Sequence, residues 1–470
     1  MKTLVIGIDG LGDASIKALG LRRLTEFLKQ GKMGHPKIDN VVSRGWPELY
    51  SGKTAYETGA FYVRPEFGGR RLQISKRTGL AAVLQTTPAE ELLWNKLGRN
   101  GESVSVFTLP TVPVLHDIGG FSVAGTGGGK FGNALVAADL SPAGLFQRDE
   151  FRGVDLGLRM GFGAWLPQSV DELASGVEAH LTAYFRLLKM GLTRCRTAHL
   201  VMGTRFVSEM SYKFIGLLED SRYENGSVAK SIKAAVFELA KRFDELVVSF
   251  IEECNATHVF IVSDHGIKSL RWHVNLNEIL LELGYLSRAS STPTNFLRPK
   301  VRRIRASLRH QVAPPDVPRY SLEKSLAFSP GFTDVLHLGP ARQIDTAKSR
   351  RYYADALVEQ LSDWLRTHPQ EAIRNFHPIP ELPREHRVVP FEFPDVRAVL
   401  SEGAFNSGRH WKPVQPFVPN FESILTEGYF GEYSGTKAQD TLAAYVGPDA
   451  SIVDLSSLTA ISASITTVAS

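Results

Sequence analysis

The sequence has few cysteines, little net charge and no long apolar segment. Two of its 470 residues are cysteines, which excludes a disulfide-rich scaffold and is typical of proteins in reducing compartments. Its 54 basic and 49 acidic residues leave a formal net charge of +5, so the composition does not indicate a nucleic-acid-binding protein. No apolar run approaches the roughly 18 residues that a membrane-spanning helix needs. We therefore expect a soluble, cytoplasmic protein that does not bind membranes.

The N-terminus also lacks the features of a signal peptide, because its apolar run is short and no small-residue cleavage site follows it. Residues 3–8 instead have the composition of a strand that is buried on both faces. The hydrophobic content of 43% is sufficient for a large core. The length allows two or three domains, or one large α/β domain with an insertion, and we find no internal repeat.

A glycine-rich run from Gly119 to Gly129, followed by Lys130, does not have the residue order of a phosphate-binding loop. That motif requires a glycine six residues before the lysine and a serine or threonine directly after it. Ala124 and Phe131 occupy these two positions. We interpret the run as a flexible loop.

Two predicted strands end in side chains that suit a metal ion. Residues 259–263 are mostly apolar and β-favouring, and Asp264 and His265 follow them, as Asp9 follows the strand at 3–8. Ligands bind at the carboxyl ends of strands in open α/β sheets, so these groups are candidate ligands of zinc or a similar divalent ion. The alternatives are a polar surface turn for the Asp-His pair and a helix N-cap for Asp9.

The remaining patterns favour an α/β fold with an insertion. Helical periodicity at 169–194 and 226–253 flanks a further inner strand that we predict at 198–203. The composition then changes, and we divide the chain into a first core part, an inserted cap region and a C-terminal core part, at 1–287, 288–400 and 401–470.

The predicted cap region is basic and rich in proline. Its basic run at 298–309 is typical of a solvated surface. The alternative is a contact with phosphate or another anionic partner, and nucleic acid is the least favoured of these partners.

Several segments resemble the alkaline phosphatase superfamily, and more narrowly its type I phosphodiesterase/nucleotide pyrophosphatase family. The resemblance covers nearly the whole chain and is most specific where Ser263-Asp264-His265-Gly266 is followed by Asn275-Leu276-Asn277. Further matching segments are 5–10, 46–52, 109–113, 119–125, 284–286, 394–396 and 434–436. The resemblance implies an alkaline-phosphatase-like three-layer sandwich with a mostly parallel central sheet and an inserted cap region.

The family uses two metal ions, and the resemblance implies that Asp9, Asp264 and His265 form one ligand set, for a divalent ion that we expect to be zinc. The second ligand set departs from the family pattern. Arg205 stands where the family has an aspartate, and Glu209 and Lys437 stand where it has histidines. Because guanidinium and ammonium groups cannot bind a metal, we expect a single ion.

The nucleophile position of the family falls on Val42, which has no nucleophilic atom. Ser43 is the candidate nucleophile, provided that the strand-to-helix turn is shifted by one residue. Arg205 and Lys437 are then candidate catalytic residues, because they would neutralise the oxygens of the transferred group in place of the missing ion. The candidate substrate-binding residues are Arg44, Trp46, His273 and Glu209.

Three functional hypotheses are consistent with these residues, and we favour the first. It is a phosphodiesterase- or nucleotide-pyrophosphatase-like enzyme that acts on a small phosphate ester or nucleotide with one metal ion. In the second, the same fold catalyses a non-hydrolytic group or acyl transfer in small-molecule biosynthesis, with His265, His273 or His116 as base. In the third, the protein is an inactive homologue that binds an anion or a partner.

Overall fold

The computed structural model describes residues 1–38, 45–61, 64–68, 71–75, 79–125, 135–156, 158, 167, 169–219, 227–289, 319–331, 333–341, 347–379, 394–407, 410–417 and 434–470. Within these residues the chain forms two compact units. The first consists of Met1–Ala60, Thr78–Ser269 and Pro419–Ser470, and the second of Phe61–Arg77 and Leu270–Val418. The insertion that we predicted at 288–400 falls within residues Leu270–Val418 of the second unit.

The first unit is built around an eight-stranded sheet with the order β2-β19-β9-β1-β8-β5-β6-β7. The five strands from β9 to β6 are parallel, whereas β19 and β7 are antiparallel to their neighbours. A mostly parallel central sheet in an α/β unit is therefore confirmed. The strand bounds are β1 Thr3–Ile8, β2 Lys32–Gly34, β5 Val104–Phe107, β6 Gly119–Val123, β7 Leu140–Ser141, β8 His199–Thr204, β9 His258–Val262 and β19 Ala443–Val446.

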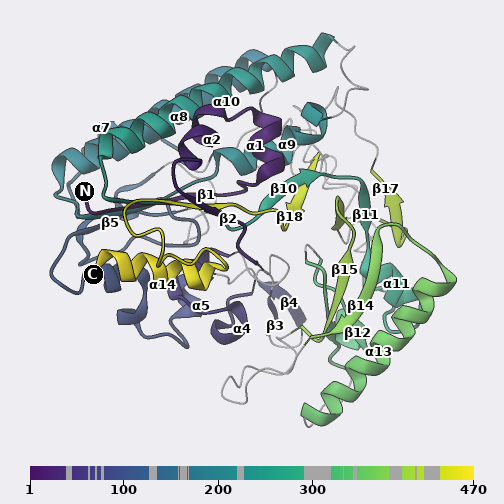
Figure 1. Ribbon diagram of the computed structural model, residues 1–470. Coiled ribbons are helices and arrows are strands. Elements are labelled where there is room, and N and C mark those ends of the chain that lie inside the picture. The colour runs from purple at the N-terminus through teal and green to yellow at the C-terminus, as the bar shows by residue number, and fades with distance from the viewer. Residues whose placement is uncertain are drawn as a thin grey trace. The chain divides into compact units, whose positions relative to one another are not determined.

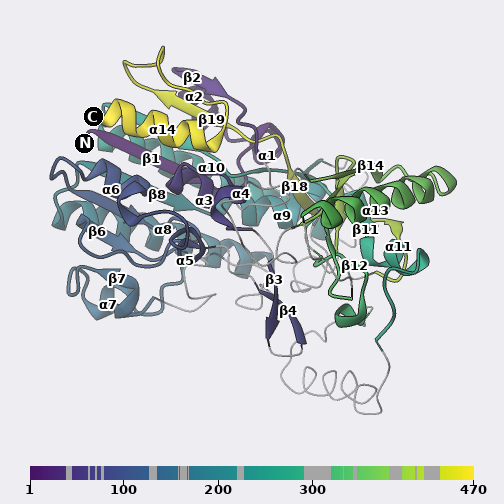
Figure 2. The same ribbon diagram turned by 90° about the horizontal axis from the view of Figure 1, so that it is seen from below.

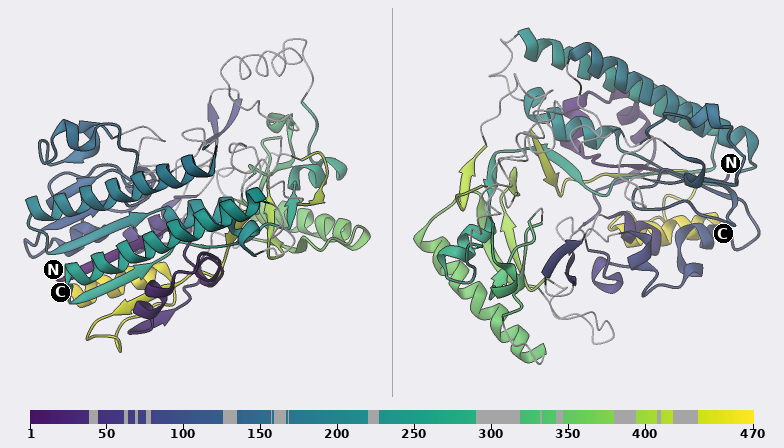
Figure 3. Two further views of the ribbon diagram at one scale, coloured as in Figure 1. Left: turned by 90° about the horizontal axis from the view of Figure 1, so that it is seen from above. Right: turned by 180° about the vertical axis from the view of Figure 1, so that it is seen from behind.

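Helices cover both faces of this sheet (Figures 1 to 3), which explains why its inner strands are apolar almost without interruption. One face packs against α1 Asp13–Leu19, α2 Arg22–Leu28, α8 Val170–Arg194, α9 Phe206–Glu219 and α10 Ser227–Cys254. The other packs against α3 Trp46–Ser51, α5 Leu80–Val83, α6 Leu93–Leu97 and α14 Leu458–Ala469. The shorter elements of the unit are α4 Ala55–Thr58, α7 Arg148–Phe151 and the antiparallel pair β10 Gly266–Ser269 and β18 Gly435–Ala438.

Helix boundaries follow from local chemistry. Ser169 begins α8 as its N-cap, because its hydroxyl accepts from the Glu172 amide at 3.1 Å. The buried α8 residues Leu173, Val177 and Leu181 then recur at a spacing of four, which keeps them on the face towards the sheet. None of the described helices is both long and apolar enough to cross a membrane.

One loop prediction was wrong. The first five residues of the glycine-rich run form β6, with Phe121 and Val123 buried. Gly120 permits this because a Cβ there would lie 2.4 Å from Ser105 Oγ and 2.5 Å from the Val104 carbonyl oxygen, so the two strands approach where no side chain fits. Residues 126–134, which include Lys130, lie outside the described part of the chain.

The second unit has its own apolar core. A four-stranded antiparallel sheet, β12-β13-β15-β14, packs with α11 and α13, and a three-stranded sheet has the order β16-β11-β17. The bounds are β11 Trp272–Val274, α11 Leu276–Glu282, β12 Ala327–Phe328, β13 Val335–Leu338, α13 Ala347–Thr367, β14 Ile373–Pro378, β15 Val396–Leu400, β16 Ala404–Asn406 and β17 Val414–Pro416. A separate hairpin pairs β3 Arg64–Gly68 with β4 Arg71–Ser75.

Candidate metal and anion site

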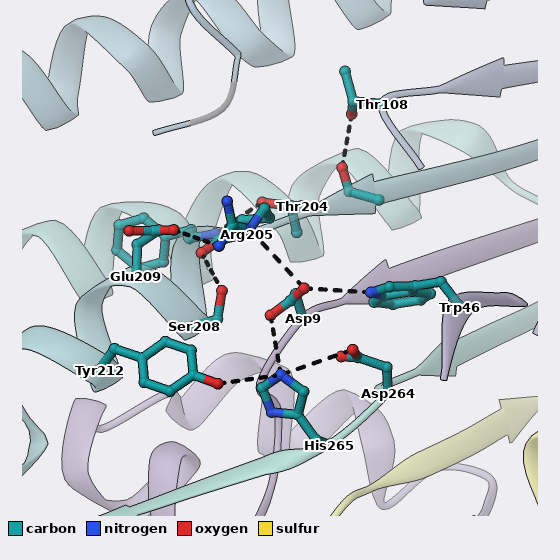
Figure 4. A network of polar contacts seen from close by, with 12 residues as sticks. Asp9, Trp46, Thr108, Thr204, Arg205, Ser208, Glu209, Tyr212, Asp264 and His265 are labelled. Carbon is teal, nitrogen blue, oxygen red and sulfur yellow. Dashed lines mark hydrogen bonds and ion pairs between the residues drawn. The ribbon is translucent and has the colours of Figure 1, made fainter. Parts of the chain in front are cut away.

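Asp9, Asp264 and His265 come together at the carboxyl edge of the central sheet (Figure 4). Each offers one potential ligand atom, and these atoms all lie within 4.8 Å of one another. All three side chains are buried. Among the described residues this is the one group of three or more histidine, cysteine or acidic side chains with that spacing.

The sheet register explains why residues 255 positions apart in the chain meet. β1 and β9 are adjacent and parallel, with Gly7 opposite Val262, so both strands end at the same edge. Ser263 then joins the two turns, because its hydroxyl accepts from the Leu11 amide at 2.8 Å and donates to the His265 carbonyl oxygen at 2.7 Å. Strand register and this short hydroxyl bridge therefore fix the positions of the three candidate ligands.

His265 presents a lone pair to the two carboxylates. Its Nδ1 lies 3.0 Å from the Gly266 carbonyl oxygen, which can only accept, so Nδ1 carries the proton and Nε2 does not. Nε2 lies 3.6 Å from Asp9 Oδ1 and 3.7 Å from Asp264 Oδ2. Burial, together with repulsion from Lys437, lowers the pKa of His265 to about 3, so the ring is neutral at neutral pH.

This donor set fits a divalent cation. Three electron-pair donors face one another in a buried position, an arrangement that a cation stabilises and that their own charges oppose. When all three carboxylates are ionised, the negative charges of Asp9, Asp264 and Glu209 exceed the two positive charges of Arg205 and Lys437 by one. Two oxygens and one imidazole nitrogen are ligands that zinc and several first-row divalent ions accept.

Arg205 lies beside the donor set and is held by two carboxylates. Its Nη2 is 2.6 Å from Glu209 Oε1, one helical turn further along, and its Nε is 4.0 Å from Asp9 Oδ2. Burial opposes ionisation of Asp9, but the positive charges of Arg205 and Lys437 and a hydrogen bond from Ser208 favour the carboxylate, and the pKa of Asp9 is lowered. Asp9 therefore stays a carboxylate despite its burial.

Lys437 belongs to the same charge environment. It lies on β18 opposite Ile267 of β10, which directly follows the Asp264-His265 turn. Its charge acts on both Asp9 and His265, lowering the pKa of each. Arg205, Glu209 and Lys437 are thus assembled around the predicted metal ligands.

Two contacts of the ligand set were not predicted from the sequence. The Trp46 indole N–H donates to Asp9 Oδ2 at 3.3 Å, and the Tyr212 hydroxyl lies 3.5 Å from His265 Nε2. Ser208 and Tyr212 are both on α9, the helix that starts directly after Arg205. They lie three and seven residues after Arg205, a spacing that places them on one helix face. This spacing is the signal in the sequence from which their position at the site could have been predicted.

The other predicted site residues lie outside the described residues, in the second unit or beside another strand. Ser43, Arg44 and Val42 lie outside the described residues. His273 belongs to the second unit, where its ring is tilted by 34° against that of His410, with the centroids 4.1 Å apart. The Nδ1 atom of His116, one candidate base, lies 3.3 Å from the hydroxyl of Ser141 on β7.

Comparisons with known proteins give matches among solved structures alone. No family model and no curated protein matches the chain. It is similar to murine ectonucleotide pyrophosphatase/phosphodiesterase 5, with 12% identity, 95% of this chain and 88% of that chain covered, and a TM-score of 0.39.

Two further similar structures are enzymes by name. Wild-type alkaline phosphatase PafA shares 11% identity, with 94% of this chain and 90% of that chain covered and a TM-score of 0.43. Phosphonoacetate hydrolase from Sinorhizobium meliloti, in complex with phosphonoacetate, shares 11% identity, with 100% and 96% covered and a TM-score of 0.47.

Proposed function

We propose that the protein is an enzyme acting on a phosphate ester with a single divalent ion, held by Asp9, Asp264 and His265. The observation that carries the proposal is the convergence of these three buried donors at the carboxyl edge of the sheet. A divalent ion there, zinc being our first choice, would polarise the phosphate oxygens and favour the deprotonated form of a nearby hydroxyl. The substrate class is a small phosphate ester or nucleotide.

Arg205 and Lys437 supply the fixed positive charge of the site. Phosphoryl transfer depends mainly on positioning and on neutralising the oxygens of the transferred group, which such cations do without a second ion. Glu209 is more than 98% buried and holds Arg205 at 2.6 Å, so it fixes the direction of the guanidinium. We therefore propose that Glu209 acts through Arg205, with the remaining guanidinium N–H groups serving the substrate.

Ser43 is the proposed nucleophile. Two residues after it, Gly45 has its backbone against Asp264, since a Cβ on Gly45 would lie 2.7 Å from Asp264 Cβ. Gly45 also has a φ of +80°, a conformation that favours glycine, so this close approach is built into the turn before α3. Ser43 would give its hydroxyl proton to solvent or to a base as its oxygen attacks phosphorus, and the ester oxygen would leave.

The test is turnover of phosphate monoesters and diesters by the wild-type protein and by Ser43→Ala, each supplied with zinc, manganese or magnesium. We expect Ser43→Ala to lower kcat by a factor of about 10³ or more, because loss of a nucleophile removes the covalent route. Ser175→Ala, which changes an exposed serine of α8, is the matched control and should keep wild-type turnover. Full turnover by Ser43→Ala would contradict the mechanism in which Ser43 is the nucleophile.

A further inference from the structure

Trp46 is the first residue of α3, and its indole contacts a proposed metal ligand. The Nε1–H group donates to Asp9 Oδ2 at 3.3 Å, as Figure 4 shows. An indole has one N–H and no acceptor, so this contact uses its entire hydrogen-bonding capacity. With a side chain that is 1% exposed, Trp46 offers no free surface to a substrate.

The two oxygens of Asp9 have different partners. Oδ1 faces His265 Nε2 at 3.6 Å, on the side of the shared ligand space. Oδ2 accepts from Trp46 and lies 4.0 Å from Arg205 Nε, on the other side. The indole N–H therefore selects the rotation of the Asp9 carboxylate that leaves Oδ1 directed at His265 and Asp264.

The backbone of β1 makes room for this indole. A Cβ at Gly7 would lie 2.7 Å from two carbons of the Trp46 six-membered ring. Asp9 directly follows β1, and its amide continues the pairing with β8 by donating to the Thr204 carbonyl oxygen at 2.9 Å. With the alternation of a strand, Gly7 and Asp9 lie on the same face, so the space for the ring lies beside the carboxylate that the ring binds.

We propose that Trp46 is a positioning residue of the metal site, which orients Asp9 for the ion and does not contact the substrate. This inference rests on the proposed function, because it takes Asp9 as a metal ligand. Hydrogen bonds to ligating carboxylates orient them, and loss of such a partner typically weakens metal binding by about 10- to 100-fold. A bond of 3.3 Å is long, so we expect a value near the lower end, about tenfold.

The experiment measures the binding of cobalt(II) alone to the metal-free protein, by competition with a chelator and by visible absorption. In Trp46→Phe we expect the dissociation constant for cobalt to rise about tenfold and the absorption bands of the bound ion to shift. Trp364→Phe is the matched control, because it removes an indole N–H that donates to Glu282 Oε2 at 2.8 Å in the second unit. This control should bind cobalt with the wild-type affinity and spectrum.

A second replacement separates the hydrogen bond from packing. Benzothienylalanine at position 46 keeps the bicyclic ring and substitutes sulfur for the N–H, so it should reproduce the weaker binding without a cavity. Wild-type affinity and an unchanged spectrum in this variant would overturn the inference and leave the proposed function intact. Failure of the wild-type protein itself to bind cobalt would overturn the proposed function, and the inference with it.

Discussion

The amino and carboxyl edges of the central sheet, where its parallel strands begin and end, both carry histidines and acidic groups, yet these groups are organised differently. At the amino edge, His199 and His258 are the first residues of β8 and β9, and both lie opposite Thr3 of β1. At the carboxyl edge, Asp9, Asp264 and His265 follow β1 and β9. The same strands therefore carry both sets of polar residues.

At the amino edge, each histidine has its own partner. His199 Nε2 lies 2.6 Å from Glu102 Oε2, and Glu102 also pairs with Lys2. His258 Nδ1 lies 2.9 Å from the Tyr445 hydroxyl and 3.7 Å from Asp449 Oδ2. One nitrogen of each histidine thus faces a hydroxyl or carboxylate of its own, and among the described residues no three potential ligand groups converge there.

At the carboxyl edge, by contrast, one potential ligand atom from each of three side chains faces a common space. Arg205 is directed to Glu209 and to the outer oxygen of Asp9, away from the histidine. Buried histidines beside carboxylates therefore do not by themselves indicate a metal site. Convergence of several acceptors on one buried space does, because a cation stabilises such a cluster.

The largest expected difference between the edges is in metal binding. Asp264→Asn removes a charged ligand at the carboxyl edge, and we expect it to weaken binding of zinc or cobalt by more than about 100-fold, since loss of an outer partner alone costs about 10- to 100-fold. Glu102→Gln, the matched change at the amino edge, should leave the affinity unchanged and lower the melting temperature. Isothermal titration of both metal-free variants checks this, and equal affinities would contradict the distinction.

At the amino edge we expect a smaller effect, which is a loss of folding stability as the pH falls. Burial lowers the pKa of His258, and the attraction of Asp449 does not restore it. The unfolded chain, with a histidine pKa of about 6.5, then binds the proton first, so stability decreases as the pH falls below about 6.5. The difference in melting temperature between the wild-type protein and His258→Gln should therefore shrink between about pH 7.5 and about pH 5. A constant difference would show that His258 does not titrate in this range.

The convergence of Asp9, Asp264 and His265 could be predicted from the sequence because its signal is local. An apolar strand followed at once by an aspartate or an Asp-His pair places those side chains at a sheet edge, and adjacent parallel strands then bring them together. The pairing of Arg205 with Glu209 could also have been predicted from the sequence, since their spacing of four residues is that of neighbours on a helix.

Other features depended on tertiary packing that the sequence does not reveal. The contact from Trp46 to Asp9 requires α3 to lie over β1 at Gly7, and the approach of Tyr212 to His265 requires α9 to pack beside the same edge. His273 is eight residues after His265, but the chain passes into the second unit between them.

The central claim is that the carboxyl edge holds one divalent ion, and counting the ions is its most direct test. The metal-free protein would be titrated with zinc or cobalt, and the bound metal measured by elemental analysis after removal of the excess. We predict about one ion per wild-type chain and close to none per chain of Asp9→Asn, which removes a ligand charge. Two ions per wild-type chain, no bound ion, or full retention of the ion by Asp9→Asn would contradict the account.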